Sequence, residues 1–296
     1  MTVALSSPLY VLGAWSAGDT GVTDANGTTW AVRPGTTGIF DGPDVRLNQS
    51  PFPNADGAQR SRNFRIPRQM TISGWARGSS VAGTEASRRA FVNLLVNGGQ
   101  DTLTVTYLDG LTLTALVERA GQPKATPASA GEFDWQLTLS AVDPSLYGAL
   151  VSQSTGLPSG SGGLDWSTGG GLDWTGGSTG GLDWGTVTSL GLITLTNNGQ
   201  VKTWPTFTIV GPVTNPTIVG PDGRQLVFTD TLAASDTVVL RSNPINRAVT
   251  KNNVPFRPNL TVAQWWSLPA QSSVTVQFQG TSAGTPTLTV SASDAY

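Results

Sequence analysis

The sequence of 296 residues contains no cysteine and no histidine. Without cysteine the chain has no disulfide, no thiolate nucleophile and no zinc site built on sulfur. Without histidine it lacks the side chain whose free pKa lies closest to neutral pH and which most often serves as a general acid or base. These absences exclude much of the familiar chemistry of enzymes. We therefore expect a protein that is not an enzyme, with no catalytic residue, no cofactor and no metal.

Charge and long apolar runs are scarce as well. Charged residues make up 12% of the chain and the formal net charge is −2, so there is no overall basic field of the kind that holds nucleic acid. No stretch approaches the roughly 18 apolar residues of a membrane span. Residues 1–15 carry no Lys or Arg ahead of their apolar residues, which is unlike a signal peptide. We expect a soluble chain that is made in a cytoplasm and does not insert into a membrane.

The residues that are present have the pattern of a mainly β protein. Short runs rich in Val, Thr, Leu and Ile are separated by clusters of Gly, Pro, Asn and Asp. Apolar and polar residues alternate strictly in 103–107 and 111–114, and Asp109 and Gly110 between them predict a hairpin turn. The strands expected in the first half are Leu9–Leu12, Trp30–Arg33, Gln69–Arg77, Asp101–Tyr107, Leu111–Glu118 and Phe133–Ala141.

One segment, residues 84–96, has helical periodicity instead. It places Ala90, Phe91, Leu94 and Leu95 on one face, which we expect to cover one side of the first sheet. Thr84 is the expected N-cap, and Glu85 suits the positive end of the helix dipole. Gly98 and Gly99 would end the helix.

A tract rich in Gly, Ser and Thr divides the chain. The tetrapeptide Gly-Leu-Asp-Trp occurs in it three times, at 163–166, 171–174 and 181–184. A length of 296 residues fits two domains on the usual scale of about 150 residues each. We expect an N-terminal β domain over residues 1–150, a connecting ribbon over 151–186 and a C-terminal β-sandwich over 187–296. The strands expected there are Gly191–Asn197, Thr206–Val210, Pro216–Val219, Gln225–Thr229, Asp236–Arg241, Ser273–Gln279 and Pro286–Ala292, with a turn at 220–223.

The repeats offer carboxylates and indoles, and each has several interpretations. Two of Asp165, Asp173 and Asp183 could form a glycosidase pair, but glycine-flanked carboxylates have no apolar pocket to raise one pKa. A calcium site fits slightly better, and carboxylates that cap repeated turns fit best. Trp166, Trp174 and Trp184 could be a platform for sugar rings. Because so glycine-rich a stretch cannot bury indoles itself, we favour their docking on another domain or subunit. Trp265 and Trp266 are expected to be a buried structural pair.

A local basic stretch is the other candidate interface. Its residues are arginines with no acidic residue among them: Arg60, Arg62, Arg65, Arg68 and Arg77. Arginine binds carboxylates in a bidentate geometry, which favours pairing between subunits over a polyanion site or a solvated loop.

Taken in order, these features resemble the distal tail protein (Dit) family of long-tailed bacteriophages, in the form found as minor tail proteins of actinobacterial siphoviruses. The resemblance spans nearly the whole chain. It rests on the stretches 41–46, 60–77, the helix after Thr84, 135–137, 143–148 (Asp-Pro-Ser-Leu-Tyr-Gly), 205–212 and 284–290.

The resemblance implies a structural virion protein at the distal end of the phage tail, assembled in the host cytoplasm. Its N-terminal β domains would form a ring, usually a homohexamer, with galectin-like C-terminal sandwiches outside it. The implied partners are the tail tube protein, the tail-tip or baseplate hub protein and the tape measure protein, and DNA would pass through the ring without specific binding. The alternative function is a glycan-binding β-sandwich module for host attachment.

Overall fold

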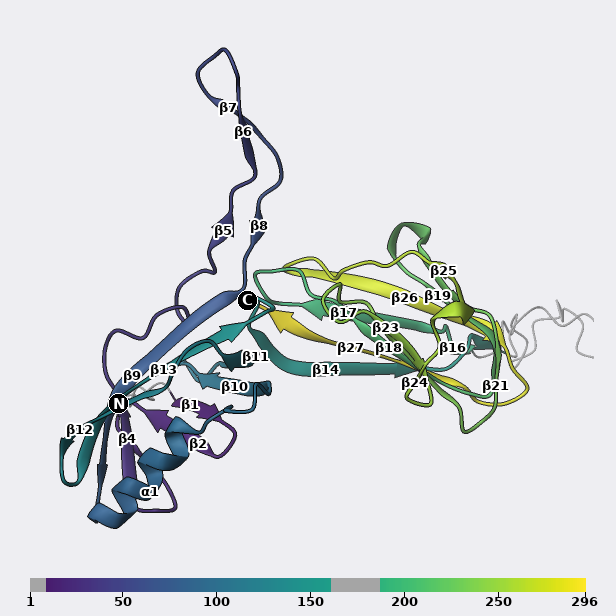
Figure 1. The fold of residues 1–296 in the computed structure, drawn as a ribbon. Coiled ribbons are helices and arrows are strands. Elements are labelled where there is room, and N and C mark those ends of the chain that lie inside the picture. The colour runs from purple at the N-terminus through teal and green to yellow at the C-terminus, as the bar shows by residue number, and fades with distance from the viewer. Residues whose placement is uncertain (1–8, 161–186) are drawn as a thin grey trace, which may run out of the picture. The chain divides into compact units, whose positions relative to one another are not determined.

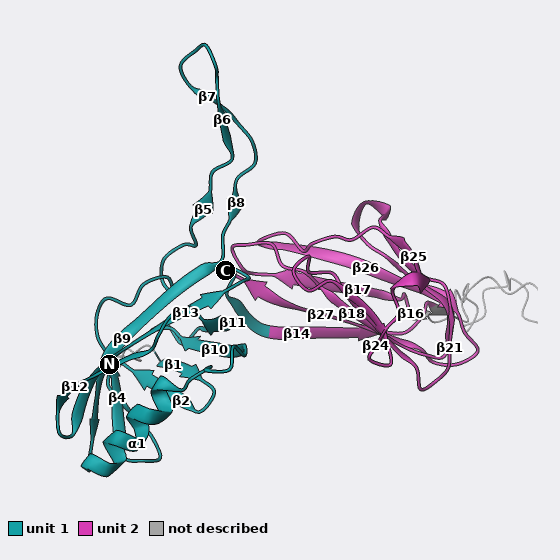
Figure 2. Cartoon of the chain, in the orientation of Figure 1, with its two compact units in different colours: residues 1–149, 296 teal, residues 150–295 magenta. Residues whose placement is uncertain are grey.

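The computed structural model describes residues 9–160 and 187–296 and divides the chain into two compact units. Unit 1 comprises residues 1–149 together with Tyr296, and unit 2 comprises residues 150–295 (Figure 2). Strands dominate both units, and the described residues contain a single α-helix (Figure 1). The mainly β fold expected from the sequence is confirmed.

Unit 1 is built around a closed sheet. Seven strands follow one another in the order β13-β9-β4-β2-β1-β10-β11, and β11 pairs again with β13, so the sheet closes into a barrel. Closure satisfies the backbone groups that an open sheet would leave at its edges. The barrel strands are β1 (Leu9–Leu12), β2 (Trp15–Gly18), β4 (Thr28–Val32), β9 (Arg68–Gly78), β10 (Asp101–Thr106), β11 (Thr112–Arg119) and β13 (Glu132–Ala141), while β3 (Val22–Thr23) pairs with β4 and β12 (Lys124–Ser129) with β13.

Alternating side chains fill the barrel. In β13 every second residue from Phe133 to Ala141 is buried, as strict alternation predicts. Trp15, Trp30 and Trp135 meet Phe91 of the helix, with ring centroids 5.2 to 6.1 Å apart. The predicted strands of this half all occur, with ends shifted by no more than two residues.

The helix, α1 (Val81–Val92), begins earlier than expected. Its N-cap is Ser80, whose hydroxyl accepts a hydrogen bond from the Gly83 amide, so the prediction of Thr84 as N-cap was wrong. Thr84 is instead buried in the first turn and donates to the Ser80 carbonyl. Ala90 is exposed, and the buried helical face consists of Thr84, Ser87 and Phe91. Two polar residues on the inner face hid it from a search for an apolar stripe.

Asp24 joins the helix to the barrel. One carboxylate oxygen accepts from the Ser87 hydroxyl at 2.6 Å and from the Trp30 indole N–H at 2.9 Å. The other accepts from the backbone amides of Asn26 and Thr28, both at 2.9 Å. Burial raises the pKa of Asp24, but the four hydrogen bonds outweigh this effect and hold the pKa below its ordinary value.

Four short strands lie outside the barrel. They form two antiparallel pairs, β5 (Val45–Arg46) with β8 (Phe64–Arg65) and β6 (Gln49–Pro51) with β7 (Ala58–Arg60). Together they make a long hairpin that leaves the barrel just before β9 (Figure 1). We call residues 44–66 the arm. The sequence patterns did not predict it.

Unit 2 is a sandwich of two antiparallel sheets. One contains β27-β18-β22-β23-β24 with β14 beside β27, and the other contains β17-β26-β19-β20-β25. The predicted sandwich is therefore present, with additional strands at 248–251, 254–255 and 260–263 that the sequence patterns missed. The strands are β14 (Tyr147–Thr155), β15 (Ser159–Gly160), β16 (Val187–Ser189), β17 (Leu192–Asn197), β18 (Thr206–Val210), β19 (Val213–Val219), β20 (Gln225–Phe228), β21 (Thr231–Leu232), β22 (Thr237–Arg241), β23 (Ala248–Lys251), β24 (Val254–Pro255), β25 (Leu260–Ala263), β26 (Ser272–Thr281) and β27 (Thr287–Ala295).

Turns and aromatic packing in unit 2 agree largely with expectation. Asp222 and Gly223 both take positive φ angles, of 59° and 71°, in the turn predicted at 220–223. Trp266 is buried against Phe207 with ring centroids 5.3 Å apart. Trp265 is only half-buried, and the Arg247 guanidinium lies over its ring, so the predicted buried pair holds for one of its two members.

Candidate assembly surface

The arm is almost entirely solvent-exposed. Every residue from 44 to 66 is exposed except Asn63, which is half-buried. The backbone ladder continues between the two strand pairs through bonds from the Ser61 amide to the Asn48 carbonyl and from the Ile66 amide to the Asp44 carbonyl. Isolated two-stranded hairpins are only marginally stable in water because they bury so little apolar surface. The arm thus holds a defined pairing without a core of its own.

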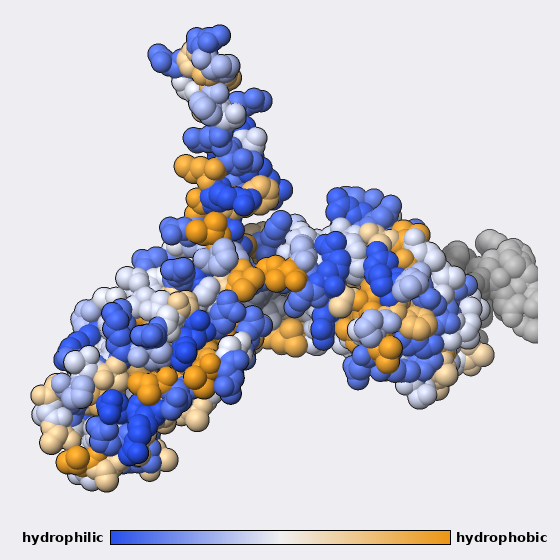
Figure 3. Space-filling model, viewed as in Figure 1, coloured by the Kyte–Doolittle hydropathy of each residue, from blue (hydrophilic) through white to orange (hydrophobic). Residues whose placement is uncertain are grey.

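Apolar side chains gather on this exposed hairpin. Leu47 is 62% exposed, and Val45, Phe52, Phe64 and Ile66 are exposed as well. Figure 3 shows apolar residues concentrated on the part of the arm nearest its base, along β5 and β8. Contiguous apolar surface that lacks a cover in a single chain marks a site for another protein or a membrane.

The arm also carries arginines. The Arg46 and Arg62 guanidinium carbons both lie 5.7 Å from the centroid of the Phe64 ring. Within the described residues, the ion pairs formed by acidic side chains do not include Arg46, Arg60 or Arg62. Exposed arginines that flank an aromatic ring are typical of the residues that dominate binding energy at protein interfaces.

The base of the arm, in contrast, is held firmly by Arg68. Its guanidinium donates to the carbonyls of Pro144, Gly38 and Asp41 at 2.8 to 2.9 Å, and more weakly to that of Ile39 at 3.4 Å. The residue is only 5% exposed. Burial lowers the pKa of Arg68 from its very high ordinary value, which leaves the side chain charged at neutral pH.

Neighbouring groups extend this anchorage. Arg65 donates to the Ser145 hydroxyl at 2.8 Å, and the Tyr107 hydroxyl donates to the Ile39 carbonyl at 3.2 Å. The Tyr147 hydroxyl donates to the Asp143 carboxylate at 2.6 Å, and burial raises the pKa of Tyr147 well above its ordinary value. The Asp-Pro-Ser-Leu-Tyr-Gly stretch at 143–148 therefore receives the base of the arm.

The predicted arginines accordingly have different positions. Arg60 and Arg62 lie exposed on the arm, and Arg65 is exposed but bonded to Ser145. Arg77 is exposed on β9 and pairs with Glu132 at 3.3 Å. The prediction of Arg68 as an interface residue was wrong, because the guanidinium is buried and bonded within its own unit.

The other predicted interface residues, Trp166, Trp174 and Trp184, lie outside the described residues, as do Asp165, Asp173 and Asp183. The apolar residues of the arm were missed, since the sequence search followed only the arginines. An available signal was the occurrence of Phe64 and Ile66 between arginines, with no buried strand face to receive them.

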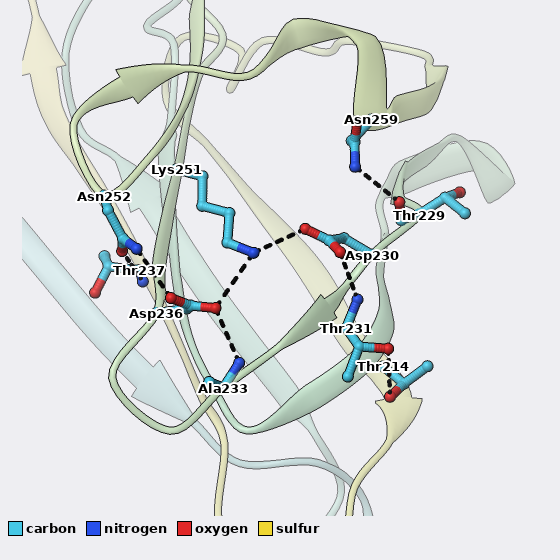
Figure 4. A network of polar contacts seen from close by, with 10 residues as sticks. All are labelled: Thr214, Thr229, Asp230, Thr231, Ala233, Asp236, Thr237, Lys251, Asn252 and Asn259. Atoms are coloured by element: carbon cyan, nitrogen blue, oxygen red, sulfur yellow. Dashed lines mark hydrogen bonds and ion pairs between the residues drawn. The ribbon is translucent and has the colours of Figure 1, made fainter.

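Unit 2 contains a polar cluster of its own, shown in Figure 4. The Lys251 ammonium lies between the carboxylates of Asp230, at 2.9 Å, and Asp236, at 3.2 Å. Asn252 also donates to Asp236 at 2.9 Å. Hydrogen bonds, first of all that from Asn252, lower the pKa of Asp236 to about 2. Since Lys251 neutralises both carboxylates, the cluster ties the segment before β22 to β23.

Other kinds of site were sought in the part of the chain that the structure describes. It contains no group of three or more acidic residues placed to hold a metal ion. It also contains no helix long and apolar enough to cross a membrane. The exposed arm remains the most distinctive surface of the described residues.

No protein-family model matches the sequence, and no curated protein is significantly similar to it. The fold, however, is shared with solved phage proteins. SPP1 Dit, described as a paradigm of the hub adsorption apparatus in phages that infect Gram-positive bacteria, aligns with a TM-score of 0.62 and 12% identity, over 98% of this chain and 99% of that one. A chain of the phage p2 baseplate in its activated conformation with strontium aligns with a TM-score of 0.53 and 11% identity, over 96% and 97%. The chain thus has the fold of these phage Dit and baseplate proteins, as the resemblance in sequence implied.

Proposed function

We propose that this chain is a Dit-type structural protein of a phage tail and not an enzyme. Its copies form a closed ring at the distal end of the tail, with six copies expected from the family. The ring joins the tail tube protein to the tail-tip or baseplate proteins, contacts the tape measure protein and lets DNA pass without specific binding. The shared fold supports the family assignment, and one observation of this chain carries the assembly.

That observation is the arm. A hairpin whose pairing is defined, whose base is anchored by a buried arginine and whose apolar residues are exposed is a surface prepared for another protein. Burying an exposed large apolar side chain contributes about 1.5 to 3 kcal/mol, so the arm gains from a partner the stabilisation that it lacks alone. A second copy of the chain is always present at the site of assembly and is the partner we propose.

An arm that contacts a different surface on a second copy makes a heterologous contact. Repeating one such contact produces either an open filament or a ring that closes after a fixed number of copies. A ring covers every arm with a neighbour, which is the requirement that the exposed residues set.

The test is the mass of the full chain in solution, measured by mass photometry across nanomolar to micromolar concentrations. We expect one dominant oligomer whose particles are closed rings in electron micrographs. The matched variant replaces residues 47–62 by a two-residue Asn-Gly turn, which keeps β5, β8 and the base anchored by Arg68. This variant should be a folded monomer. A wild-type chain that is monomeric throughout, or an armless variant that still forms the ring, would contradict the proposal.

The glycan-binding alternative depends chiefly on Trp166, Trp174 and Trp184, which lie outside the described residues. It predicts that replacing all three by alanine abolishes binding to cell-wall polysaccharide and leaves assembly intact. The ring hypothesis predicts instead that these indoles contact protein in the assembled state.

A further inference from the structure

The arm needs a receiving surface, and the barrel offers one on its outer wall where the sheet closes. The closing pair, β11 and β13, is joined through only two residue pairs, Glu118 with Ser140 and Arg119 with Leu139. Beyond these pairs the two strands separate, because β11 pairs next with β14 at Tyr147. The closure therefore leaves a seam on the barrel wall.

Apolar side chains are exposed at this seam. In β11 the outward residues alternate with buried ones, and Leu116 among them is 55% exposed. Val142 follows β13 on the same side as Ser140 and is 44% exposed. Continuing the register of Glu118 and Ser140 by two residues places Leu116 opposite Val142. Two exposed aliphatic side chains thus lie across one narrow gap.

The charge of the seam is opposite to that of the arm. Glu118 lies on the same outer face as Leu116 and takes part in none of the ion pairs of the described residues. The arm has four arginines against the two aspartates Asp44 and Asp56. Of these arginines, Arg46 and Arg62 flank the exposed Phe64 ring. Each surface therefore has what the other lacks, apolar groups with arginine on one and apolar groups with a carboxylate on the other.

The arm is also long enough. An extended strand rises about 3.3 Å per residue, so the roughly ten residues from base to tip reach about 30 Å, which is the diameter of a small domain. Such an arm spans the barrel of a neighbouring copy from one side to the other.

We propose that the arm of one copy docks on the β11–β13 seam of a second copy, with Phe64 and Leu47 against Leu116 and Val142 and with Arg46 or Arg62 facing Glu118. This proposal rests on the ring proposed above and names the surface through which it forms. Docking of this kind favours the correct partner because opposite charges steer the encounter and like charges would oppose it.

The absence of native cysteine makes a direct test available. Two double variants, Leu47→Cys with Leu116→Cys and Phe64→Cys with Leu116→Cys, are assembled and oxidised, and the products are separated by mass without reductant. We expect at least one of them to form a ladder of covalently linked copies. Val81 on α1 is 56% exposed, almost the same as Leu116, and supplies the matched control. Leu47→Cys with Val81→Cys should give no ladder above background.

Charge reversal gives a second, independent reading. Glu118→Arg should weaken assembly about tenfold or more, since it faces arginine with arginine. Adding Arg46→Glu or Arg62→Glu to that variant should restore assembly. Rings that form without either ladder, or with an equal ladder from the Val81 control, would overturn the docking site and leave the ring in place. A chain that never oligomerises would overturn the ring and the docking site together.

Discussion

The barrel and the arm of unit 1 use the same backbone pairing and differ in what covers it. The barrel closes seven strands on themselves and surrounds Trp15, Trp30 and Trp135 with their neighbours. The arm pairs four short strands, and all its residues but Asn63 are exposed. Hydrogen bonds alone contribute modestly to stability, so burial decides which region can stand alone. The barrel carries the stability of the unit, and the arm carries its capacity for contact.

The junction between these regions should show the largest effect. We predict that Arg68→Met lowers the free energy of unfolding of unit 1 by about 3 kcal/mol, because several buried carbonyls lose their only charged donor. Urea denaturation followed by tryptophan fluorescence measures this change, and hydrogen exchange should show faster exchange at residues 38–41 and 143–146.

Arg60→Met is the matched control, since Arg60 is an exposed arginine of the arm itself. It should change the free energy of unfolding by no more than about 0.5 kcal/mol. Equal effects of the two substitutions would show that the base of the arm is not anchored as described.

The link between barrel and helix should show a smaller effect that depends on pH. Asp24→Ala removes four hydrogen bonds and should cost about 2 kcal/mol at neutral pH. The pKa of Asp24 is lowered in the folded state, so its contribution is complete above the unfolded pKa of about 3.9 and disappears as pH falls through the folded pKa. The unfolding curves of wild type and variant should therefore converge in acid.

Asp19 is an exposed aspartate of the same strand region and serves as the control. Asp19→Ala should leave both the stability at neutral pH and its acid dependence nearly unchanged. A constant difference between wild type and Asp24→Ala from pH 7 to pH 2 would contradict the assigned role of the carboxylate.

The contrast between barrel and arm also explains what the sequence could predict. Alternation marks a strand only where one face is buried, so β1, β9 and β13 were located closely and the arm strands were not. The same rule contained the position of Arg68, which shares the inward face of β9 with Met70 and Ile72. Charge made it look like a surface residue, and only the carbonyls brought near by residues 38–41 and 144 make its burial favourable.

The candidate surface was predictable in part. The sequence located the arginine stretch, but the apolar partners of those arginines depend on the hairpin that brings Phe64 beside Arg46, eighteen positions away. Similarly, Leu116 and Val142 each read as an ordinary strand residue, and only the closure of the barrel at Glu118 and Ser140 leaves both exposed. Long-range pairing of this kind is not encoded in any local period.

The smallest effect on stability should come from the arm itself, and it completes the comparison. Phe64 is 47% exposed, whereas Phe133 of β13 is 1% exposed and packs on Trp30 with ring centroids 5.4 Å apart. Phe133→Ala should cost about 3 to 5 kcal/mol of unfolding free energy, as is typical of a buried phenylalanine. Phe64→Ala should cost the monomer less than about 0.5 kcal/mol, because its ring has little cover to lose. In assembly the order reverses for the folded variants: Phe64→Ala should raise the concentration needed for ring formation about tenfold or more, since interface aromatics contribute most to binding. Denaturation at nanomolar concentration and mass photometry at micromolar concentration separate the two quantities. A large loss of monomer stability from Phe64→Ala would mean that the arm has a core within its own chain, and unchanged assembly would mean that Phe64 meets no partner.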